Sequence, residues 1–239
     1  MKRLALALLL MVLPAAAQDV EEVTVYGGSL SGIWKVTVPS YAQVTILNGT
    51  NWGPLHNGFC RIDRDASGYV THCFGQEQAG HGGTLETDGT HFHLAWGSML
   101  ARLVYDGVVE SATRFTGHFA IKLAGIPTEN ADLSEGNKIE LQDNMPDTGG
   151  KAELLRAILN GSPLPHDAAL DGRIAAARAM MASPIQSISY LGQQSKSGGP
   201  GKPPEPDFYT VYAVTFENGV KLCALHQKAD GTLDAFQCV

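Results

Sequence analysis

The chain has 239 residues and a formal net charge of −7, and its Lys and Arg residues form no cluster. This acidic balance argues against a protein that binds nucleic acid or an anionic membrane surface. The length is enough for one large domain or two small ones. Composition therefore indicates a globular acidic protein with no nucleic-acid partner, and it specifies no reaction.

The N-terminus has the pattern of a secretory signal peptide. Two basic residues, Lys2 and Arg3, precede an apolar run over residues 4–13 and a short Ala-rich stretch. This pattern predicts export and cleavage before Gln18, and the apolar run is too short to cross a bilayer. Removing Lys2 and Arg3 leaves 15 basic against 24 acidic side chains, a net charge of −9. We therefore expect a periplasmic or secreted protein without a membrane span.

The first half of the chain is rich in Gly and has a strand-like pattern. Short alternating or apolar stretches are separated by turn sequences such as Asp88-Gly89 and Asp106-Gly107. Such stretches bounded by Gly, Asp and Ser are typical of β-strands. They predict strands at residues 32–38, 58–63, 69–74, 84–87, 91–96, 101–105 and 113–124. About seven strands joined by tight turns favour a closed antiparallel barrel or a sandwich.

The second half begins with helical periodicity and then returns to strands. A first helix, which Asp147 or Thr148 can cap, places Leu154, Leu155, Ile158 and Leu159 on one apolar face and ends before Gly161. A second helix follows Asp167, and its apolar face contains Leu170, Ile174, Ala177 and Met181. Strands are then predicted at residues 187–191, 208–216, 220–226 and 232–238.

These patterns predict a mainly β fold with an α+β second domain. An antiparallel β-barrel comes first, and a domain of two helices and an antiparallel sheet follows. The expected limits are residues 1–17 for the signal peptide, 18–28 for an extended N-terminus, 29–141 for the barrel and 150–239 for the α+β domain.

The four cysteines favour two local disulfides among the three pairings that four cysteines allow. Cys60 and Cys73 flank a strand–turn–strand pattern, and Cys223 and Cys238 flank Asp230-Gly231, a strong hairpin signal. When the chain folds back at Asp230-Gly231, residues whose numbers sum to 461 lie opposite each other. The numbers of Cys223 and Cys238 have this sum. Both pairs are therefore predicted as cross-strand disulfides, which an oxidising compartment permits. The alternative is four buried free thiols.

The start of the predicted barrel resembles the Gly-x-Trp opening of lipocalins and related calycin barrels. Gly32 and Trp34 occupy the two motif positions, and residues 115–121 are similar to a closing strand of such barrels. The resemblance implies that Trp34 packs under the first strand and closes the base of the barrel. It also implies a small apolar ligand inside.

Four stretches of the second half carry a resemblance, residues 152–156, 187–192, 212–219 and 229–231. Together they are similar to a bacterial accessory module often found behind penicillin-binding-protein-like serine hydrolases. This resemblance implies a cystatin-like or nuclear-transport-factor-like unit, in which helices pack on an antiparallel sheet. It implies no catalytic residue for this chain.

Catalytic signatures are missing from the sequence. It contains no Ser-x-x-Lys, Gly-x-Ser-x-Gly, His-Glu-x-x-His, phosphate-binding loop or Gly-x-Gly-x-x-Gly motif. We therefore assign no catalytic residue and no cofactor, and an enzymatic function is not indicated.

The histidines of the first half are the one concentration of polar residues. His91 and His93 are two residues apart on a predicted strand and so share one face. Two imidazoles at this spacing can bind one metal ion, with His72 or His118 as a third ligand. The alternative is that Phe92 and Leu94 form the buried face, which directs His91 and His93 outward.

Two tryptophans and one histidine are candidates for contact with a small ligand. Trp52 falls in a predicted loop, Trp96 alternates with Leu94, and His118 lies on a later strand. Burial in the core is the alternative for Trp96.

The leading functional hypothesis is a non-enzymatic binding protein for a small apolar ligand or for a protein partner at the cell envelope. The alternatives are a histidine–metal protein or metal-dependent enzyme, and a pure protein-interaction module.

Overall fold

The computed structural model describes most of the chain that follows the predicted signal peptide. The described residues are 30–37, 45–46, 50–51, 57–66, 68–74, 83–97, 101–123, 130–142, 146–181, 183–195 and 208–239. The predicted signal peptide and the extended N-terminus lie outside them.

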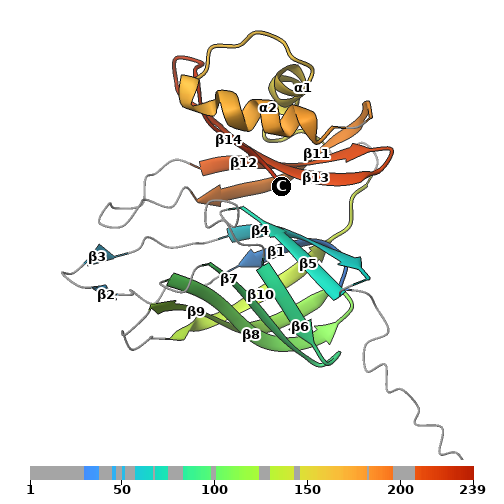
Figure 1. The fold of residues 1–239 in the computed structure, drawn as a ribbon, viewed down its shortest axis with the longest axis vertical. Helices are drawn as coiled ribbons and strands as arrows, with labels where there is room; N and C mark the ends of the chain where they lie inside the picture. The colour runs from blue at the N-terminus through green and yellow to red at the C-terminus, as the bar shows by residue number, and fades with distance from the viewer. Residues whose placement is uncertain are drawn as a thin grey trace, which may run out of the picture.

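An eight-stranded antiparallel sheet closes on itself to form a barrel, in the lower part of Figure 1. The strand order around the barrel is β1-β10-β9-β8-β7-β6-β5-β4, and β4 pairs with β1 to close it. The short strands β2 (Thr45–Ile46) and β3 (Thr50–Asn51) form a separate pair. The barrel strands are β1 (Gly32–Thr37), β4 (Asn57–Asp65), β5 (Gly68–Cys73), β6 (Gly83–Thr87), β7 (His91–Gly97), β8 (Ala101–Ser111), β9 (Arg114–Leu123) and β10 (Asn130–Ile139). The predicted fold class is confirmed.

The barrel differs from the sequence prediction in two strands. Strand β10 was not predicted, because its sequence is polar, yet it closes the barrel by pairing with both β9 and β1. The predicted turn at Asp106-Gly107 is wrong, since β8 runs through both residues. A Cβ atom at Gly107 would lie 2.6 Å from the ring of Phe92. Glycine is therefore needed at this position for close packing within the sheet and not for a turn.

Aromatic side chains fill the described interior of the barrel. Trp34 is fully buried, and its ring centroid lies 4.7 Å from that of Phe115, which also packs against Phe92 and Tyr105. The indole Nε1 of Trp34 donates to the carbonyl of Leu30 at 2.7 Å. Trp34, Phe92 and Phe115 lie near the end of the barrel that holds the β4–β5, β6–β7 and β8–β9 turns, which we call the base.

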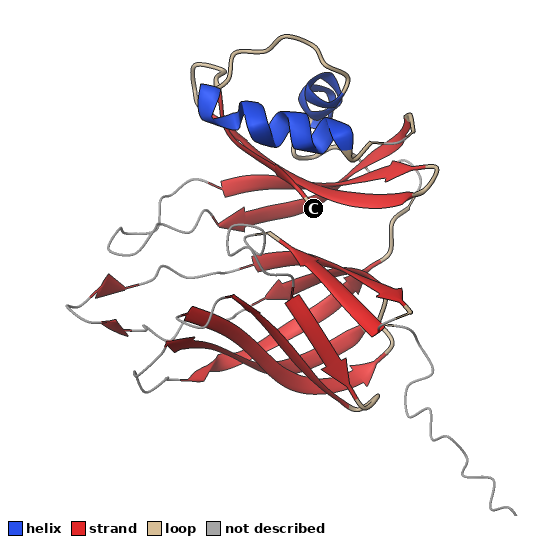
Figure 2. Cartoon of the chain, viewed as in Figure 1, coloured by secondary structure: helices blue, strands red, loops and turns tan. Residues whose placement is uncertain are grey.

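The C-terminal part of the chain forms a four-stranded antiparallel sheet with two helices on one face, shown in Figure 2. The helices are α1 (Ala152–Leu159) and α2 (Asp171–Ala179), the latter preceded by the 3₁₀ turn η2 (Ala168–Leu170). The strands, in sheet order, are β11 (Ile185–Ser195), β12 (Phe208–Phe216), β13 (Gly219–Gln227) and β14 (Leu233–Cys238). The predicted apolar helix faces are buried against this sheet through Leu155, Ile158, Leu159, Ile174 and Ala177.

The start of α1 is tied to the sheet through Asp147. The Asp147 carboxylate accepts the main-chain N–H of Ala152 at 2.8 Å and the hydroxyl of Tyr212 at 2.8 Å. The same hydroxyl accepts the N–H of Lys151 at 2.9 Å. Burial, followed by the hydrogen bond to Asp147, raises the pKa of Tyr212. The predicted N-cap at Asp147 or Thr148 is wrong, because the N-cap position is Lys151, whose side chain makes no capping hydrogen bond. Asp147 nevertheless satisfies a free N–H at the helix start and fixes the helix on β12.

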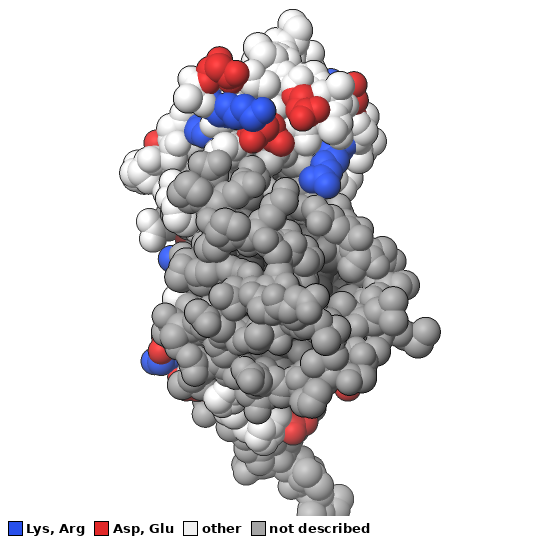
Figure 3. Space-filling model, turned by 90° about the vertical axis from the view of Figure 1, so that its left-hand side faces the viewer, with Lys and Arg blue, Asp and Glu red and all other residues white. Residues whose placement is uncertain are grey.

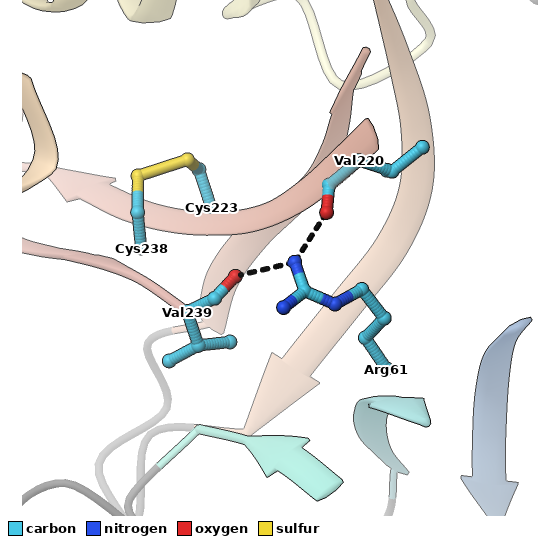
Figure 4. Close-up of a disulfide and its surroundings, with 5 residues drawn as sticks. All are labelled: Arg61, Val220, Cys223, Cys238 and Val239. Atoms are coloured by element: carbon cyan, nitrogen blue, oxygen red, sulfur yellow. Dashed lines mark hydrogen bonds between the residues drawn. A yellow bond between two sulfur atoms is a disulfide. The ribbon is translucent and has the colours of Figure 1, made fainter. Parts of the chain in front are cut away.

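The sheet is buried on both faces, since its second face lies on the barrel. Val211 and Ala213 of β12 pack with Ile33 of β1 and Phe59 of β4 in one apolar cluster. In Figure 4, Arg61 of β4 reaches across to the C-terminal sheet, where its guanidinium donates to the carbonyl oxygens of Val220 and Val239. Its Nε donates to Asp63 at 2.9 Å. The molecule is therefore three layers deep: helices, sheet and barrel.

Both predicted disulfides are present. Cys60 pairs with Cys73 between β4 and β5, and Cys223 pairs with Cys238 between β13 and β14. In each case the two cysteines are direct cross-strand partners. The described residues include no free cysteine.

The hairpin around Asp230-Gly231 has the predicted pairing but a different turn. Gly231 has a φ of +86°, and the N–H of Lys228 donates to the carbonyl of Thr232 at 2.9 Å, which leaves a three-residue loop over residues 229–231. The pairing register shifts by one residue between His226 and Gln227, and this shift compensates for the longer loop. The pairing of Cys223 with Cys238 is thereby restored.

The pair of His166 and Asp171 makes the stability of the helix layer depend on pH. His166 Nδ1 lies 2.7 Å from the carbonyl oxygen of Leu164, and Nε2 lies 2.6 Å from the carboxylate of Asp171. Because both partners are acceptors, the protonated ring satisfies both, and the hydrogen bond to Asp171 is the main cause of a raised His166 pKa. A histidine whose pKa is raised in the folded state contributes its full stabilisation at pH values below its pKa in the unfolded chain, which is about 6.5. This contribution is lost as the pH rises through the pKa of the histidine in the folded state.

We therefore expect His166→Gln to destabilise the protein more at about pH 5.5 than at about pH 9. Urea unfolding at the two pH values measures the difference. Asp171→Asn is the control, because it should remove most of the pH dependence while keeping the imidazole. An equal loss of stability at both pH values would contradict the assignment.

Candidate functional site

An open groove lies on the outside of the barrel beside the β6–β7 turn. Its volume is about 590 Å³, and carbon atoms make up most of its exposed lining. It is lined by Glu86, Thr87, Asp88, His91, Phe92, His93, Asp106, Gly107 and Val108.

Strand alternation places the two histidines of β7 in this groove. Phe92 and Leu94 are buried in the barrel core, so His91 and His93 point outward, as the alternative interpretation of the sequence stated. Their side chains are 69% and 35% exposed. The same strand therefore supplies the interior with apolar groups and the groove with imidazoles.

Pairing between strands builds a row of ionisable side chains across the outer face. Glu86 of β6 pairs with His93 of β7, His93 pairs with Asp106 of β8, and Asp106 pairs with His118 of β9. Side chains directly opposite in an antiparallel sheet are in contact range. His93 Nδ1 lies 2.5 Å from a carboxylate oxygen of Asp106. The row thus alternates between carboxylates and imidazoles.

Asp88 forms the turn end of the groove. One carboxylate oxygen accepts the main-chain N–H groups of His91 at 2.6 Å and Thr90 at 2.8 Å, and the other lies 3.3 Å from the His91 ring. The main-chain bond from His91, followed by that from Thr90, lowers the pKa of Asp88 to about 2. Asp88 is therefore negatively charged over the whole physiological range, and the turn holds it in a fixed position.

The proposed metal ligands do not meet at one point. Asp88 engages His91, Asp106 engages His93, and His72 lies on β5 with its Nε2 3.3 Å from Asp63. Burial, followed by the nearby Arg61, lowers the pKa of His72. Within the described ranges, no three His, Cys, Asp or Glu side chains form a group that could hold a metal ion.

The residues predicted to contact a small ligand are only partly described. Trp52 lies outside the described residues, and Trp96 is placed on β7 without a description of its side chain. His118 is exposed on β9, where it faces Asp106 from the neighbouring strand. His118 therefore belongs to the outer row and cannot line the interior of the barrel.

Sequence reasoning missed the carboxylates of the groove and Val108. Asp88 and Asp106 each precede Gly, a dipeptide that signals a turn, and both were assigned to turns. Only Asp88 lies in one, whereas Asp106 lies within β8 beside His93. The sequence signal that could have placed Asp106 and Val108 on the outer face of β8 is their alternation with the apolar residues Tyr105 and Val109, which are buried.

The charges on the C-terminal layers contrast with those of the groove. On the face shown in Figure 3, acidic and basic side chains are interspersed over the described helix layer. The groove lining contains Glu86, Asp88 and Asp106 and, among described residues, no Lys or Arg. None of the described helices has both the length and the hydrophobicity needed to cross a membrane.

Comparison of the chain with protein-family models, with curated proteins and with solved structures finds no match. The resemblances to calycin barrels and to the cystatin-like module thus receive no support from related proteins. Function must be inferred from the geometry of the described residues.

Proposed function

We propose that this chain is an exported, non-enzymatic binding protein that contacts a protein partner at the cell envelope. The contact surface is the groove on the outer face of β6, β7 and β8. Two disulfides fit an oxidising compartment such as the periplasm or the extracellular space, in agreement with the predicted signal peptide.

The proposal depends on where the described part of the molecule has a concave surface that no other described element covers. The described interior of the barrel contains the rings of Trp34, Phe92 and Tyr105, each of which contacts the ring of Phe115. Both faces of the C-terminal sheet are covered, one by the helices and one by the barrel. The groove is open, and Val108 in its lining is 41% exposed, one of three exposed large apolar side chains among the described residues.

A small apolar ligand in the barrel is the second candidate. The closed sheet of eight strands favours this candidate. Eight-stranded barrels are just wide enough to hold one small ligand when side chains leave room. This candidate agrees with the calycin-like interpretation, and the C-terminal unit is then a cystatin-like module that stabilises the barrel wall.

Native mass spectrometry of protein purified from the periplasm tests both candidates. We expect the mature chain to begin at Gln18 and to carry a protein partner. In Val108→Arg the partner should be lost, because a long charged side chain then projects into the groove. Met180→Arg is the matched control, since Met180 is 37% exposed on the helix layer and should leave the complex intact.

The alternatives give different masses in the same experiment. A small organic adduct that survives Val108→Arg would favour the barrel ligand. A metal adduct lost in His91→Ala with His93→Ala would favour a metal-binding function. A partner retained equally by Val108→Arg and Met180→Arg would contradict the groove as the contact surface.

A further inference from the structure

We propose that the groove on β6, β7 and β8 recognises a cationic segment of its partner, in which Lys or Arg side chains alternate with small apolar ones. This inference rests on the proposed function and adds the chemistry of the partner to it. The charge of the groove, the fixed position of its aspartates and its exposed apolar side chain support this inference.

The charge of the groove has one sign. Its lining contains the carboxylates of Glu86, Asp88 and Asp106, and no Lys or Arg among the described residues. The imidazoles of His91 and His93 lie between these carboxylates. Complementary charge steers association and suppresses unsuitable partners, so an acidic segment is disfavoured and a basic one is favoured.

Two of the three carboxylates, those of Asp88 and Asp106, are held in place before a partner arrives. Main-chain N–H groups of the β6–β7 turn fix Asp88, and the ring of His93 contacts Asp106 at 2.5 Å. Glu86 and Asp106 lie on strands that flank His93 on either side. Because the two aspartates need little reorganisation, a cation entering the groove loses less free energy to ordering than it would on a flexible surface.

The apolar part of the groove suits the stems of basic side chains. Val108 is exposed beside Asp106, two residues away on the same face of β8. Lys and Arg bury their methylene stems on apolar surface while the charged group stays near a carboxylate. A metal ion alone would gain nothing from this apolar surface, and the described ligands do not converge on one point.

Isothermal titration calorimetry with short peptides tests the inference. The probe is an amidated hexapeptide of alternating Arg and Val, and the comparison peptide alternates Glu and Val. We expect heat of binding only with the Arg peptide, and weaker affinity when NaCl is raised from about 50 mM to about 500 mM. Equal binding of both peptides, or binding of neither, would overturn the proposal.

Charge-neutralising variants locate the binding. Glu86→Gln with Asp106→Asn should weaken binding of the Arg peptide by about tenfold, because two of the three carboxylates are removed. The control is Glu153→Gln with Glu217→Gln, which removes the same charge from exposed positions on α1 and on the β12–β13 turn. An equal effect of the two double variants would show attraction by net charge alone and refute a site.

Failure of this inference is distinguishable from failure of the proposed function. If the Arg peptide does not bind while the native partner is still lost in Val108→Arg, the groove is a contact surface for a partner of other chemistry. If the partner is also insensitive to Val108→Arg, the proposed function is wrong as well.

Discussion

Replacing Trp34 by Ala is expected to lower the free energy of unfolding by about 3–5 kcal/mol, the usual cost of removing a fully buried Trp side chain. The ring is 0% exposed and contacts Phe115, which in turn packs on Phe92 and Tyr105. The main-chain carbonyl of Leu30 also loses its hydrogen-bond donor. The cavity cannot collapse easily, because the surrounding strands belong to a closed sheet. Urea unfolding followed by circular dichroism measures the loss.

Two further variants make this result specific. Trp34→Phe keeps an aromatic ring but loses the indole N–H, so we expect a loss intermediate between those of wild type and Trp34→Ala. Phe208→Ala removes a large aromatic side chain that is 44% exposed, and should change stability by only about 0.5 kcal/mol. If Trp34→Ala were no more destabilising than Phe208→Ala, the base of the barrel would not depend on this residue.

The double substitution Cys223→Ala and Cys238→Ala should cost about 3 kcal/mol, since the bridge closes a loop of roughly 15 residues. The sequence separation of the two cysteines is 15, and both are buried in the cluster that packs against the helices. In the chain-entropy account, the open chain gains freedom in the unfolded state, and this gain destabilises the fold. The midpoint of urea unfolding under non-reducing conditions provides the measurement.

The second bridge serves as the comparison. Cys60→Ala with Cys73→Ala should cost a similar amount, because its sequence separation is 13. The two bridges share no partner, so the losses should add in the fourfold variant to within about 0.5 kcal/mol. Non-reducing peptide mapping checks the pairing itself. A peptide that links Cys60 to Cys223 or to Cys238 would contradict the structure.

Local sequence patterns were sufficient to predict the structure wherever residues close together in the chain determine it. The numbering around Asp230-Gly231 predicted that Cys223 faces Cys238 and that Leu225 faces Phe236, and both pairs are observed. The periodicity of residues 152–159 predicted α1 and its buried face. In these cases a tight turn or a helical repeat fixes side-chain direction within a few residues, and no distant contact is required.

The candidate site was only half predictable. Alternation along β7 indicated that His91 and His93 share a face, and burial of Phe92 decides that this face is the outer one. The partner of His93 was not indicated, because Asp106 is 13 residues away and precedes a glycine that resembles a turn signal. Only the pairing of β7 with β8 brings the two side chains together.

By itself, the sequence determined the strand-rich first half, the helices and final meander of the second half, both disulfides, and which face of β7 is apolar. Only the tertiary structure decided that β10 closes the barrel, that the C-terminal sheet rests on β1 and β4, and that Arg61 joins the two. The physical reason is that β10 and Arg61 are polar by composition, and their roles come from partners far along the chain. Such long-range pairings leave no periodic signal in the residues that make them.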